Sequence, residues 1–397
     1  MRGSVIKRPT TKRNSNYFVV VDVRDNEGIR RRRWISDPAT GSGFSTKKAA
    51  ETYLTSILSD LDSGAYVPPS KETLGSWLTQ WLIIRKPALK PSTFFSYEKN
   101  IRVRIKPALG ALPLQKVTAV HLDRLYSELL VSGRVDKKKG AGLSPRTVAY
   151  IATILKRALK DATRKGLIKV NPADAADAPR NRSMAPGATK AWQKDELAAF
   201  LVGSADHPLG PIWAFLASTG CRRSEALGLR WSDVDFELSR VSIVQSVQKI
   251  AGKIYFDTVK TDASKRAVSL DRDAAIMLRE LRKDQLKQRL VMGSAWAEHN
   301  LVFTGPTGEP LYPDRITRAF STEVLRLKLP VITLHGLRHT WATIALREGI
   351  HPKLVQERLG HANVGITLGI YSHVAPTMHD DAAETVARAV REARLHA

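Results

Sequence analysis

The third part of this chain contains the stretch Ser218-Thr-Gly-Cys-Arg-Arg-Ser-Glu225, followed directly by Ala-Leu-Gly-Leu-Arg-Trp231. Its glycine is expected to end one helix, so that Arg222 begins the next. The N-terminus of a helix favours anions, because its first backbone N–H groups have no partner within the helix. An arginine after a glycine turn is also common as a helix cap or as half of a surface ion pair. The stretch therefore predicts an anion site only if other residues support it.

Three polar motifs lie downstream of this stretch. The first is Val259-Lys-Thr-Asp-Ala-Ser-Lys-Arg266, which is expected to place Lys260 in a turn between strands. The second is Leu334-His-Gly-Leu-Arg-His-Thr340, in which His335 and Arg338 share one face of a turn, and the third is Leu359-Gly-His361, which precedes Tyr371. Each has an ordinary structural interpretation when taken singly, because hairpin lysines are usually solvated, histidines structural and tyrosines packed. His335 and His339 have the spacing of zinc ligands, but Arg338 lies between them and the glutamate of metalloproteases is absent. Cys221 could be an activated thiol, although a small buried side chain is the commoner case.

The composition narrows the class of protein. A chain of 397 residues exceeds what one hydrophobic core usually supports, so two or three domains are expected. The single cysteine excludes a disulfide scaffold and a cysteine-based zinc site. No apolar run approaches the roughly 18 residues of a membrane span, and no signal-peptide core follows the first residues. The net charge of +25 predicts a polyanionic partner, nucleic acid rather than a membrane.

Two proline-marked linkers, Gly64–Ser70 and Asn171–Ala188, predict three domains: residues 1–66, 67–183 and 184–397. Residues 67–180 hold most of the charge, with 22 basic and 8 acidic side chains. The expected fold is multidomain. It has a small β-sheet plus a helix in the first domain, an all-α second domain, and an α+β, mainly helical third domain with a small antiparallel sheet.

The first domain is predicted to contain three strands, two of them at Tyr17–Arg24 and Arg30–Ile35, and a helix capped by Ser45 or Thr46. Its cations Arg30, Arg31, Arg32 and Arg33 cluster on the sheet and have few acidic neighbours. A small basic sheet backed by a helix could lie in the major groove of DNA. A merely solvated basic sheet is the alternative.

The second domain is predicted to be helical at residues 74–84, 92–105, 118–130 and 145–165. The last helix begins with Ser144 and Pro145, a cap followed by a proline in the first turn. A helical wheel places four cations on one face and apolar residues opposite them: Arg146, Arg157, Lys160 and Arg164. Asp161 is the only acid near them, so phosphate contacts are favoured over a solvated face.

The third domain has a mixed pattern. Helices are predicted at Trp192–Val202, Pro211–Ser218, Arg272–Arg289, Arg315–Leu325, Trp341–Glu348, Pro352–Leu359 and Asp380–Arg394. Strands are predicted at Val241–Val247, Lys253–Asp257 and Ala267–Ser269.

Together, the four motifs resemble those of tyrosine recombinases of the phage integrase type, and the resemblance covers nearly all of the chain. Members of that family carry T-G-x-R-x-S-E, a hairpin lysine, H-x-x-R-H, L-G-H and a terminal tyrosine, in this order. The resemblance implies a catalytic set without metal or cofactor: Arg222, Lys260, His335, Arg338, His361 and the nucleophile Tyr371. It also implies a core-binding domain at 67–183, a catalytic domain at 184–397 and, more loosely, an arm-binding domain at 1–66.

The resemblance gives these residue types a common chemistry. The two arginines would hold the non-bridging oxygens of a pentavalent phosphorane. Tyr371 would attack phosphorus and form a 3′-phosphotyrosine, with His335 as the proton acceptor. Lys260 would donate a proton to the leaving 5′-oxygen, and His361 would bond a phosphate oxygen.

The same resemblance implies the partners. Strand exchange would integrate or excise a mobile element through a Holliday junction, in a homotetramer on double-stranded DNA with core and arm attachment sites. Further expected partners are accessory proteins that bend DNA or set the direction of recombination. The expected location is the bacterial cytoplasm, with its nucleoid. The amphipathic tail at residues 377–397 is expected to pack on a neighbouring protomer rather than on its own chain.

Two other functions remain open from the sequence. A topoisomerase of the same mechanism would relax DNA without exchanging strands, but it needs no second DNA-binding domain. A non-catalytic DNA-binding regulator would need no tyrosine at position 371. The complete set of catalytic residue types therefore favours a recombinase over both.

Overall fold

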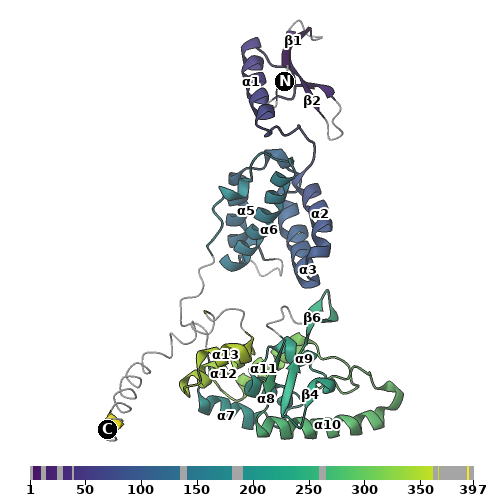
Figure 1. Ribbon diagram of the computed structural model, residues 1–397, viewed down its shortest axis with the longest axis vertical. Helices are drawn as coiled ribbons and strands as arrows, with labels where there is room; N and C mark the ends of the chain where they lie inside the picture. The colour runs from purple at the N-terminus through teal and green to yellow at the C-terminus, as the bar shows by residue number, and fades with distance from the viewer. Residues whose placement is uncertain are drawn as a thin grey trace. The chain divides into compact units, whose positions relative to one another are not determined.

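The computed structural model of the chain describes residues 3–9, 15–24, 30–37, 40–134, 141–180, 191–258 and 265–360, together with Gly365 and residues 391–392. The chain forms two compact units, Met1–Arg182 and Ser183–Ala397 (Figure 1). The finer division at residues 66/67 and 183/184 stays a prediction. Among the described residues, no helix combines the length and the apolar character that crossing a membrane requires.

The first unit begins with an antiparallel sheet in the order β1-β2-β3, which α1 covers on one face. These elements are β1 Gly3–Pro9, β2 Ser15–Arg24, β3 Arg30–Ile35 and α1 Lys47–Asp62. Thr46, one of the two predicted caps, accepts a hydrogen bond from the N–H of Ala49 at 3.2 Å. Six buried side chains form the core between sheet and helix: Val19, Val21, Ile35, Phe44, Ala50 and Ile57. The predicted fold of this part is confirmed.

The strand register places two arginines of β3, Arg32 and Arg33, on opposite faces of the sheet. Arg33 is opposite Val21, whose side chain is buried beneath α1. Arg32 is opposite Asp22 and forms an ion pair with it at 3.8 Å. Neighbouring side chains in a strand point to opposite faces. Arg32 and Arg33 therefore lie on opposite faces of the sheet, and DNA binding by residues 30–33 stays a prediction.

Helices form the rest of the first unit: α2 Leu74–Arg85, α3 Pro91–Asn100, α4 Lys106–Leu109, α5 Ala119–Ser132 and α6 Pro145–Arg164. A π-helical turn, Ile101–Ile105, joins α3 to α4. This turn is the last part of the helix predicted over 92–105. The hydroxyl of Ser144 caps α6 as predicted and accepts from the N–H of Thr147 at 3.3 Å. The apolar face of α6 packs into a core that includes Trp77 and Trp81. All four predicted ranges are helical, the range 92–105 being divided between α3 and the π-helical turn, and α4 was not predicted.

The second unit is mainly helical: α7 Lys194–Gly203, α8 Gly210–Thr219, α9 Arg223–Gly228, α10 Arg272–Met292, α11 Pro313–Arg326, α12 Gly336–Arg347 and α13 Pro352–Leu359. Its strands are β4 Val234–Asp235, β5 Arg240–Ile243, β6 Gln245–Ile250, β7 Lys253–Thr258 and β8 Arg266–Ser269. They form two small antiparallel sheets, β4-β5-β8 and β6-β7. This agrees with the predicted fold class, an α+β domain dominated by helices.

Two details of the prediction for this unit were wrong. The strand predicted at Val241–Val247 is two strands in different sheets, because β5 pairs with β8 whereas β6 pairs with β7. The helix predicted at Trp341–Glu348 begins earlier, at Gly336, so that the H-x-x-R-H motif lies on its first turns. The helix predicted at Asp380–Arg394 lies almost wholly outside the described residues.

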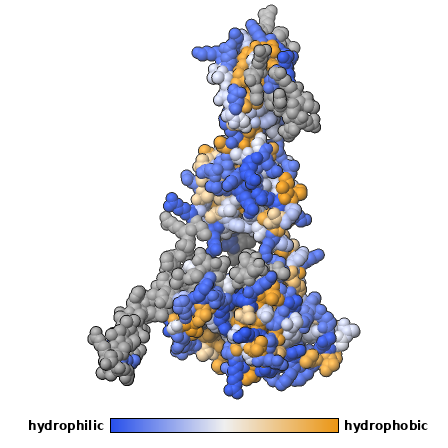
Figure 2. Space-filling model, in the orientation of Figure 1, coloured by the Kyte–Doolittle hydropathy of each residue, from blue (hydrophilic) through white to orange (hydrophobic). Residues whose placement is uncertain are grey.

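An aromatic core fixes the helices of the second unit: Trp192, Phe200, Trp213, Phe215 and Phe320 are all buried. In Figure 1, α10 runs along one edge of this unit and β6 projects from the opposite edge. Helix α12 packs against both α8 and α13. Figure 2 shows hydrophilic side chains over much of the visible face of each unit, with smaller hydrophobic areas between them.

Candidate active site

Arg222 stands at the turn between α8 and α9. The turn is made by Gly220, whose φ of +66° favours glycine, and a Cβ there would lie 2.6 Å from a methyl group of Leu359. The backbone N–H of Arg222 donates to Oε2 of Glu225 at 2.9 Å, and its Nη1 donates to Oε1 at 2.7 Å. Its Nη2 donates to the carbonyl of Gly360 at 3.0 Å. The predicted position at the start of a helix is thus found, with the side chain tied to the end of α13.

Arg338 lies in the first turn of α12 and is 3% exposed. Its Nη1 donates to the carbonyl of Gly220 at 2.9 Å, and its Nη2 donates to the carbonyl of Leu359 at 2.6 Å. Burial, followed by the charge of Arg222, lowers the pKa of Arg338 to about 9. The group is therefore still a cation at neutral pH.

His335 immediately precedes α12, three residues before Arg338. Its ring lies 4.9 Å from the ring of His339, edge to face. Partial burial, followed by the charges of His339, Arg338 and Arg222, lowers the pKa of His335 to about 4. The imidazole is therefore neutral near pH 7, which is the state that accepts a proton.

The structure brings together three of the six predicted catalytic residues: Arg222, His335 and Arg338. The other three, Lys260, His361 and Tyr371, lie outside the described residues, as does most of the tail at 377–397. Gly360 is the last described residue before His361, and its carbonyl is bound by Arg222. The described part of the site is thus an arginine cluster at the C-terminal end of α13.

Glu225 and Arg266 belong to two of the motifs, but the sequence predicted no role for either. Glu225 is 3% exposed, and the side chain of Arg266 is 7% exposed. Burial alone would raise the pKa of Glu225, but hydrogen bonds and charges from Arg266 and Arg222 lower it below the usual value. A signal was available, because Arg266 occupies the same face of β8 as the buried Val268, an unusual place for a charge.

Cys221 lies next to this cluster and is buried. Burial is the largest influence on its thiol and raises its pKa above the usual value. The thiol is therefore protonated and poorly nucleophilic near neutral pH, which favours the interpretation of a small packed side chain. Among the described residues, no cluster of three or more His, Cys, Asp or Glu could hold a metal ion.

Comparison with known proteins supports the resemblance to tyrosine recombinases that the sequence motifs indicated. The family described as "Phage integrase family" matches residues 196–378, and "Phage integrase, N-terminal SAM-like domain" matches residues 73–130. The tyrosine recombinase XerC of Bacillus subtilis (strain 168) is 30% identical over 242 residues, which cover 60% of this chain and 73% of that protein. The chain belongs to the phage integrase family. It is a tyrosine-type site-specific recombinase.

Further relatives extend over more of the recombinase. A tyrosine recombinase XerC-like protein of Caldanaerobacter subterraneus subsp. tengcongensis is 27% identical over 363 residues, 86% of this chain and 89% of that protein. The fold is similar to that of the Tn1549 transposon integrase in complex with a circular intermediate DNA, with a TM-score of 0.65, 21% identity, and coverage of 79% and 99%. It is also similar to a lambda integrase tetramer bound to a Holliday junction, with a TM-score of 0.53, 19% identity, and coverage of 89% and 92%.

The predicted DNA-contact face of α6 is exposed, but Asp161, which the helical wheel placed beside its cations, is not on this exposed face. Arg146, Arg157 and Lys160 are exposed, and no carboxylate of the described residues forms an ion pair with them. Asp161 is instead buried, where Trp81 donates to it at 2.7 Å and Arg85 lies at 2.5 Å. Arg164 lies 3.6 Å from the same carboxylate, so within the described part of this recombinase the face has three unpaired cations rather than four. Their binding to DNA stays a prediction.

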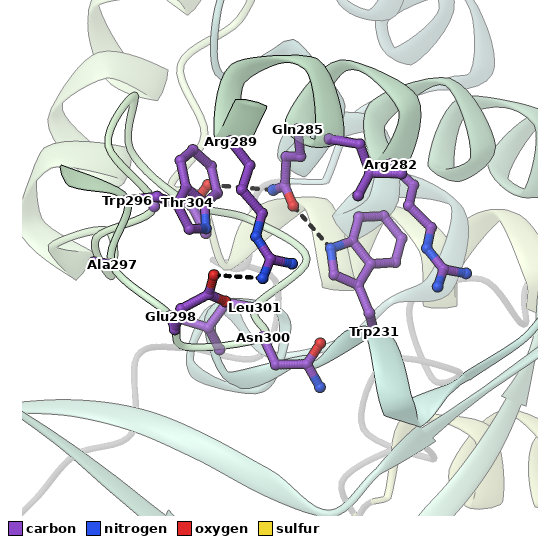
Figure 3. A pocket seen from close by; sticks show the side chains of 12 residues that line it. Trp231, Arg282, Gln285, Arg289, Trp296, Ala297, Glu298, Asn300, Leu301 and Thr304 are labelled. Carbon is purple, nitrogen blue, oxygen red and sulfur yellow. Dashed lines mark hydrogen bonds and ion pairs between the residues drawn. The ribbon is translucent and has the colours of Figure 1, made fainter. Parts of the chain in front are cut away.

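A separate hollow of about 120 Å³ lies between α10 and the segment 296–308 of the recombinase (Figure 3). Gln285 lines this hollow. Its side chain accepts a hydrogen bond from Nε1 of Trp231 at 2.8 Å and donates one to the carbonyl of Val302 at 2.6 Å. Arg289 pairs with Glu298 across its mouth at 2.7 Å. None of the arginine-cluster residues lines this hollow, so it belongs to the packing of the domain rather than to the site.

Proposed function

We propose that this recombinase cleaves and rejoins double-stranded DNA through a 3′-phosphotyrosine at Tyr371. The observation that supports this most is the convergence of Arg222 and Arg338 on the last carbonyls of α13, directly before His361 in the chain. Attack by a phenolate on a phosphodiester gives a phosphorane with additional negative charge on its non-bridging oxygens. Two guanidinium groups held in advance stabilise that charge without having to reorganise.

The two arginines differ in how they meet the phosphate. The side chain of Arg222 is 35% exposed, so it can contact a non-bridging oxygen directly. Arg338 is nearly fully buried and acts from the floor of the site, where the low dielectric constant strengthens its electrostatic attraction for the phosphate. Arg338 is fixed by two carbonyl groups, which direct it without cancelling its charge, whereas Arg222 is held by the carbonyl of Gly360 and by the carboxylate of Glu225.

The proton transfers fall to three other residues. His335, neutral near pH 7, accepts the proton of the Tyr371 hydroxyl, whose ordinary pKa is about 10. Lys260 donates a proton to the leaving 5′-oxygen, and His361 hydrogen-bonds a non-bridging oxygen. Because cations of the chain supply the charge, the reaction needs neither a metal nor another cofactor.

The exposed cations of the first unit serve DNA binding. Arg146, Arg157 and Lys160 on α6 contact phosphates of the core site, and this binding is salt-dependent because each contact releases counterions. In the N-terminal sheet, Arg32 shares the face opposite α1 with Trp34, which is 43% exposed. That face is the one that reads an arm site, whereas Arg33 lies on the helix side.

The assembly is a homotetramer that exchanges strands through a Holliday junction, with the tails at 377–397 exchanged between protomers. The likeness in fold to the lambda integrase tetramer supports this arrangement. Proteins that bend DNA or set the direction of recombination act with this tetramer, in the cytoplasm of a bacterial cell. Integration or excision of a mobile element is the result.

A plasmid assay tests this function against its rivals. A supercoiled plasmid carries two attachment sites taken from the chromosomal junctions of the element that encodes the protein, and EDTA is present throughout. Recombinant circles and a denaturation-resistant protein–DNA adduct are expected. Relaxed circles without recombinants would indicate a topoisomerase, and shifted bands without cleavage would indicate a binding regulator. Activity that returned only with magnesium would contradict the proposed chemistry.

A further inference from the structure

Three consecutive carbonyl groups at the C-terminal end of α13 each accept a hydrogen bond from a different arginine. The carbonyl of Arg358 accepts from Nε of Arg266 at 2.6 Å. The next two carbonyls accept from Arg338 at 2.6 Å and from Arg222 at 3.0 Å. The last carbonyls of a helix have no partner within it and carry a partial negative charge. The end of α13 therefore fixes three guanidinium groups side by side.

Arg266 is joined to this group a second time, through Glu225. Its Nη2 lies 2.8 Å from Oε2 of Glu225, and its Nη1 lies 3.3 Å from Oε1. The same carboxylate accepts from the side chain of Arg222 at 2.7 Å. One buried carboxylate thus lies between two arginines, of which Arg222 reaches the surface and Arg266 does not.

We infer that Arg266 is a positioning residue that sets the orientation and the effective charge of Arg222, an inference that rests on the proposed function. A buried carboxylate with one cationic partner would draw that partner into a closed pair, as arginine and carboxylate form bidentate contacts. Arg266 satisfies much of the charge of Glu225. Arg222 is then held on one edge and keeps its remaining N–H groups for a phosphate.

The position of Arg266 in the chain gives this contact a second consequence. Arg266 begins β8, and its contacts with Glu225 and Arg358 fix the start of this strand. The start of β8 is therefore held by the same carboxylate as Arg222. No similar anchor is needed for Arg338, which binds the carbonyls of Gly220 and Leu359 directly.

The space around Arg266 supports a single fixed conformation. Gly360 has a φ of +64°, and a Cβ there would lie 3.0 Å from Nη1 of Arg266. The guanidinium is thus enclosed by the end of α13 on one side and by Glu225 on another. An arginine at this position is a part of the site's frame and does not itself reach the substrate.

The test compares Arg266→Gln and Arg266→Lys in the full-length protein, on a core-site duplex nicked so that cleavage is irreversible. Arg266→Gln is expected to lower the single-turnover cleavage rate by about 10²-fold, comparable to loss of one transition-state donor, while the Kd for the duplex stays within about threefold of wild type. Arg266→Lys keeps the charge next to Glu225 and is expected to recover part of the rate. Arg326→Gln is the matched control, because it removes an arginine from the buried Glu323, which makes no contact with the arginine cluster among the hydrogen bonds and ion pairs of the described residues.

A double-mutant cycle separates positioning from simple structural support. In an Arg222→Lys background, either change at Arg266 should cost less than about threefold further, because the group it positions is already altered. An equal loss in both backgrounds, or a loss of duplex affinity as large as the loss of rate, would overturn the inference. If Arg266→Gln does not fold, as judged by thermal unfolding, Arg266→Lys in the same cycle decides.

The outcome is also distinguishable from a failure of the proposed function. If the wild-type protein forms no covalent adduct on the nicked duplex, the proposed chemistry fails and this experiment ends there. If the wild type forms the adduct and both Arg266 variants cleave at the wild-type rate, only the positioning role is overturned.

Discussion

The arginines of this recombinase occur in two contrasting settings. On α6, Arg146 and Arg157 lie at the surface without a carboxylate partner among the described residues. At the end of α13, Arg266 and Arg338 are buried, and protein groups hold their N–H donors in place. The first setting leaves the side chains mobile and suits phosphates whose position varies. The second fixes charge before the substrate arrives, which suits a transition state. The contrast predicts that changes at α13 affect rate, whereas changes at α6 affect affinity and its salt dependence.

The largest effect is expected at Tyr371, the proposed nucleophile. Tyr371→Phe should bind the core duplex like the wild type and form no covalent adduct, because the hydroxyl supplies the attacking oxygen but adds little to groove contacts. Denaturing gels measure the adduct, and mobility shifts measure binding. An adduct at wild-type yield would remove Tyr371 from this role and would leave the arginine cluster without the reaction assigned to it.

The next largest effect is expected within the buried cluster. Arg338→Lys keeps the charge but cannot reach the carbonyls of Gly220 and Leu359 with a planar fork. The single-turnover cleavage rate should fall by about 10²–10³-fold, with duplex affinity nearly unchanged. A loss confined to affinity would place Arg338 in the same class as the cations of α6. Arg326→Gln again serves as the control, because it removes an arginine that is paired with a buried carboxylate elsewhere.

A smaller effect, of a different kind, is expected on α6. Arg157→Glu combined with Lys160→Glu should weaken core-duplex binding and lower the slope of log K against log salt by about 0.9 for each phosphate that the variant no longer neutralises. At saturating protein, the cleavage rate of the bound complex should remain close to wild type. Arg164→Glu is the matched comparison, because this arginine already lies near Asp161 and should change the slope less. An unchanged slope for the double variant would mean that the face is only solvated.

The sequence predicted the parts of this structure that depend on local pattern. The cap at Ser144, the amphipathic α6 and the helix Pro352–Leu359 follow from residue types a few positions apart. The order of the motifs likewise predicted that Arg222 and Arg338 would meet, and they do.

Long-range pairing accounts for what the sequence did not predict. Residues 241–247 read as one strand because apolar alternation does not record that the pairing partner changes from β8 to β7. The burial of Asp161 was not predicted, because the groups that bind its carboxylate, Trp81 and Arg85, are about 80 residues away in the chain. The strand pattern could have indicated that Arg266 is buried, but no local pattern identifies Glu225 as its partner, because the two residues are 41 positions apart in the chain.

The smallest expected effect concerns protonation of His335 in the DNA-free protein. Its imidazole should titrate near pH 4 rather than near the usual 6.5, because burial and the neighbouring cations disfavour the charged form. Two-dimensional NMR of the histidine Cε1–Hε1 groups measures this, and the His335→Gln spectrum assigns the resonance. Titration near 6.5 would mean that solvent screens the cluster, and that His335 is partly charged when cleavage begins.

Stability gives an independent measurement of the same shift. Between pH 6.5 and about 4, the unfolded chain binds a proton at His335 and the folded chain does not, so the free energy of unfolding should fall as the pH is lowered through this window. His339, whose pKa is also lowered, first by burial and then by Arg338, contributes in the same direction. His335→Gln should therefore lose less stability than the wild type over this range, as measured by urea unfolding at a series of pH values. Equal losses in the two proteins would contradict a depressed pKa and would place His335 with the solvent-exposed groups rather than with the buried arginine cluster.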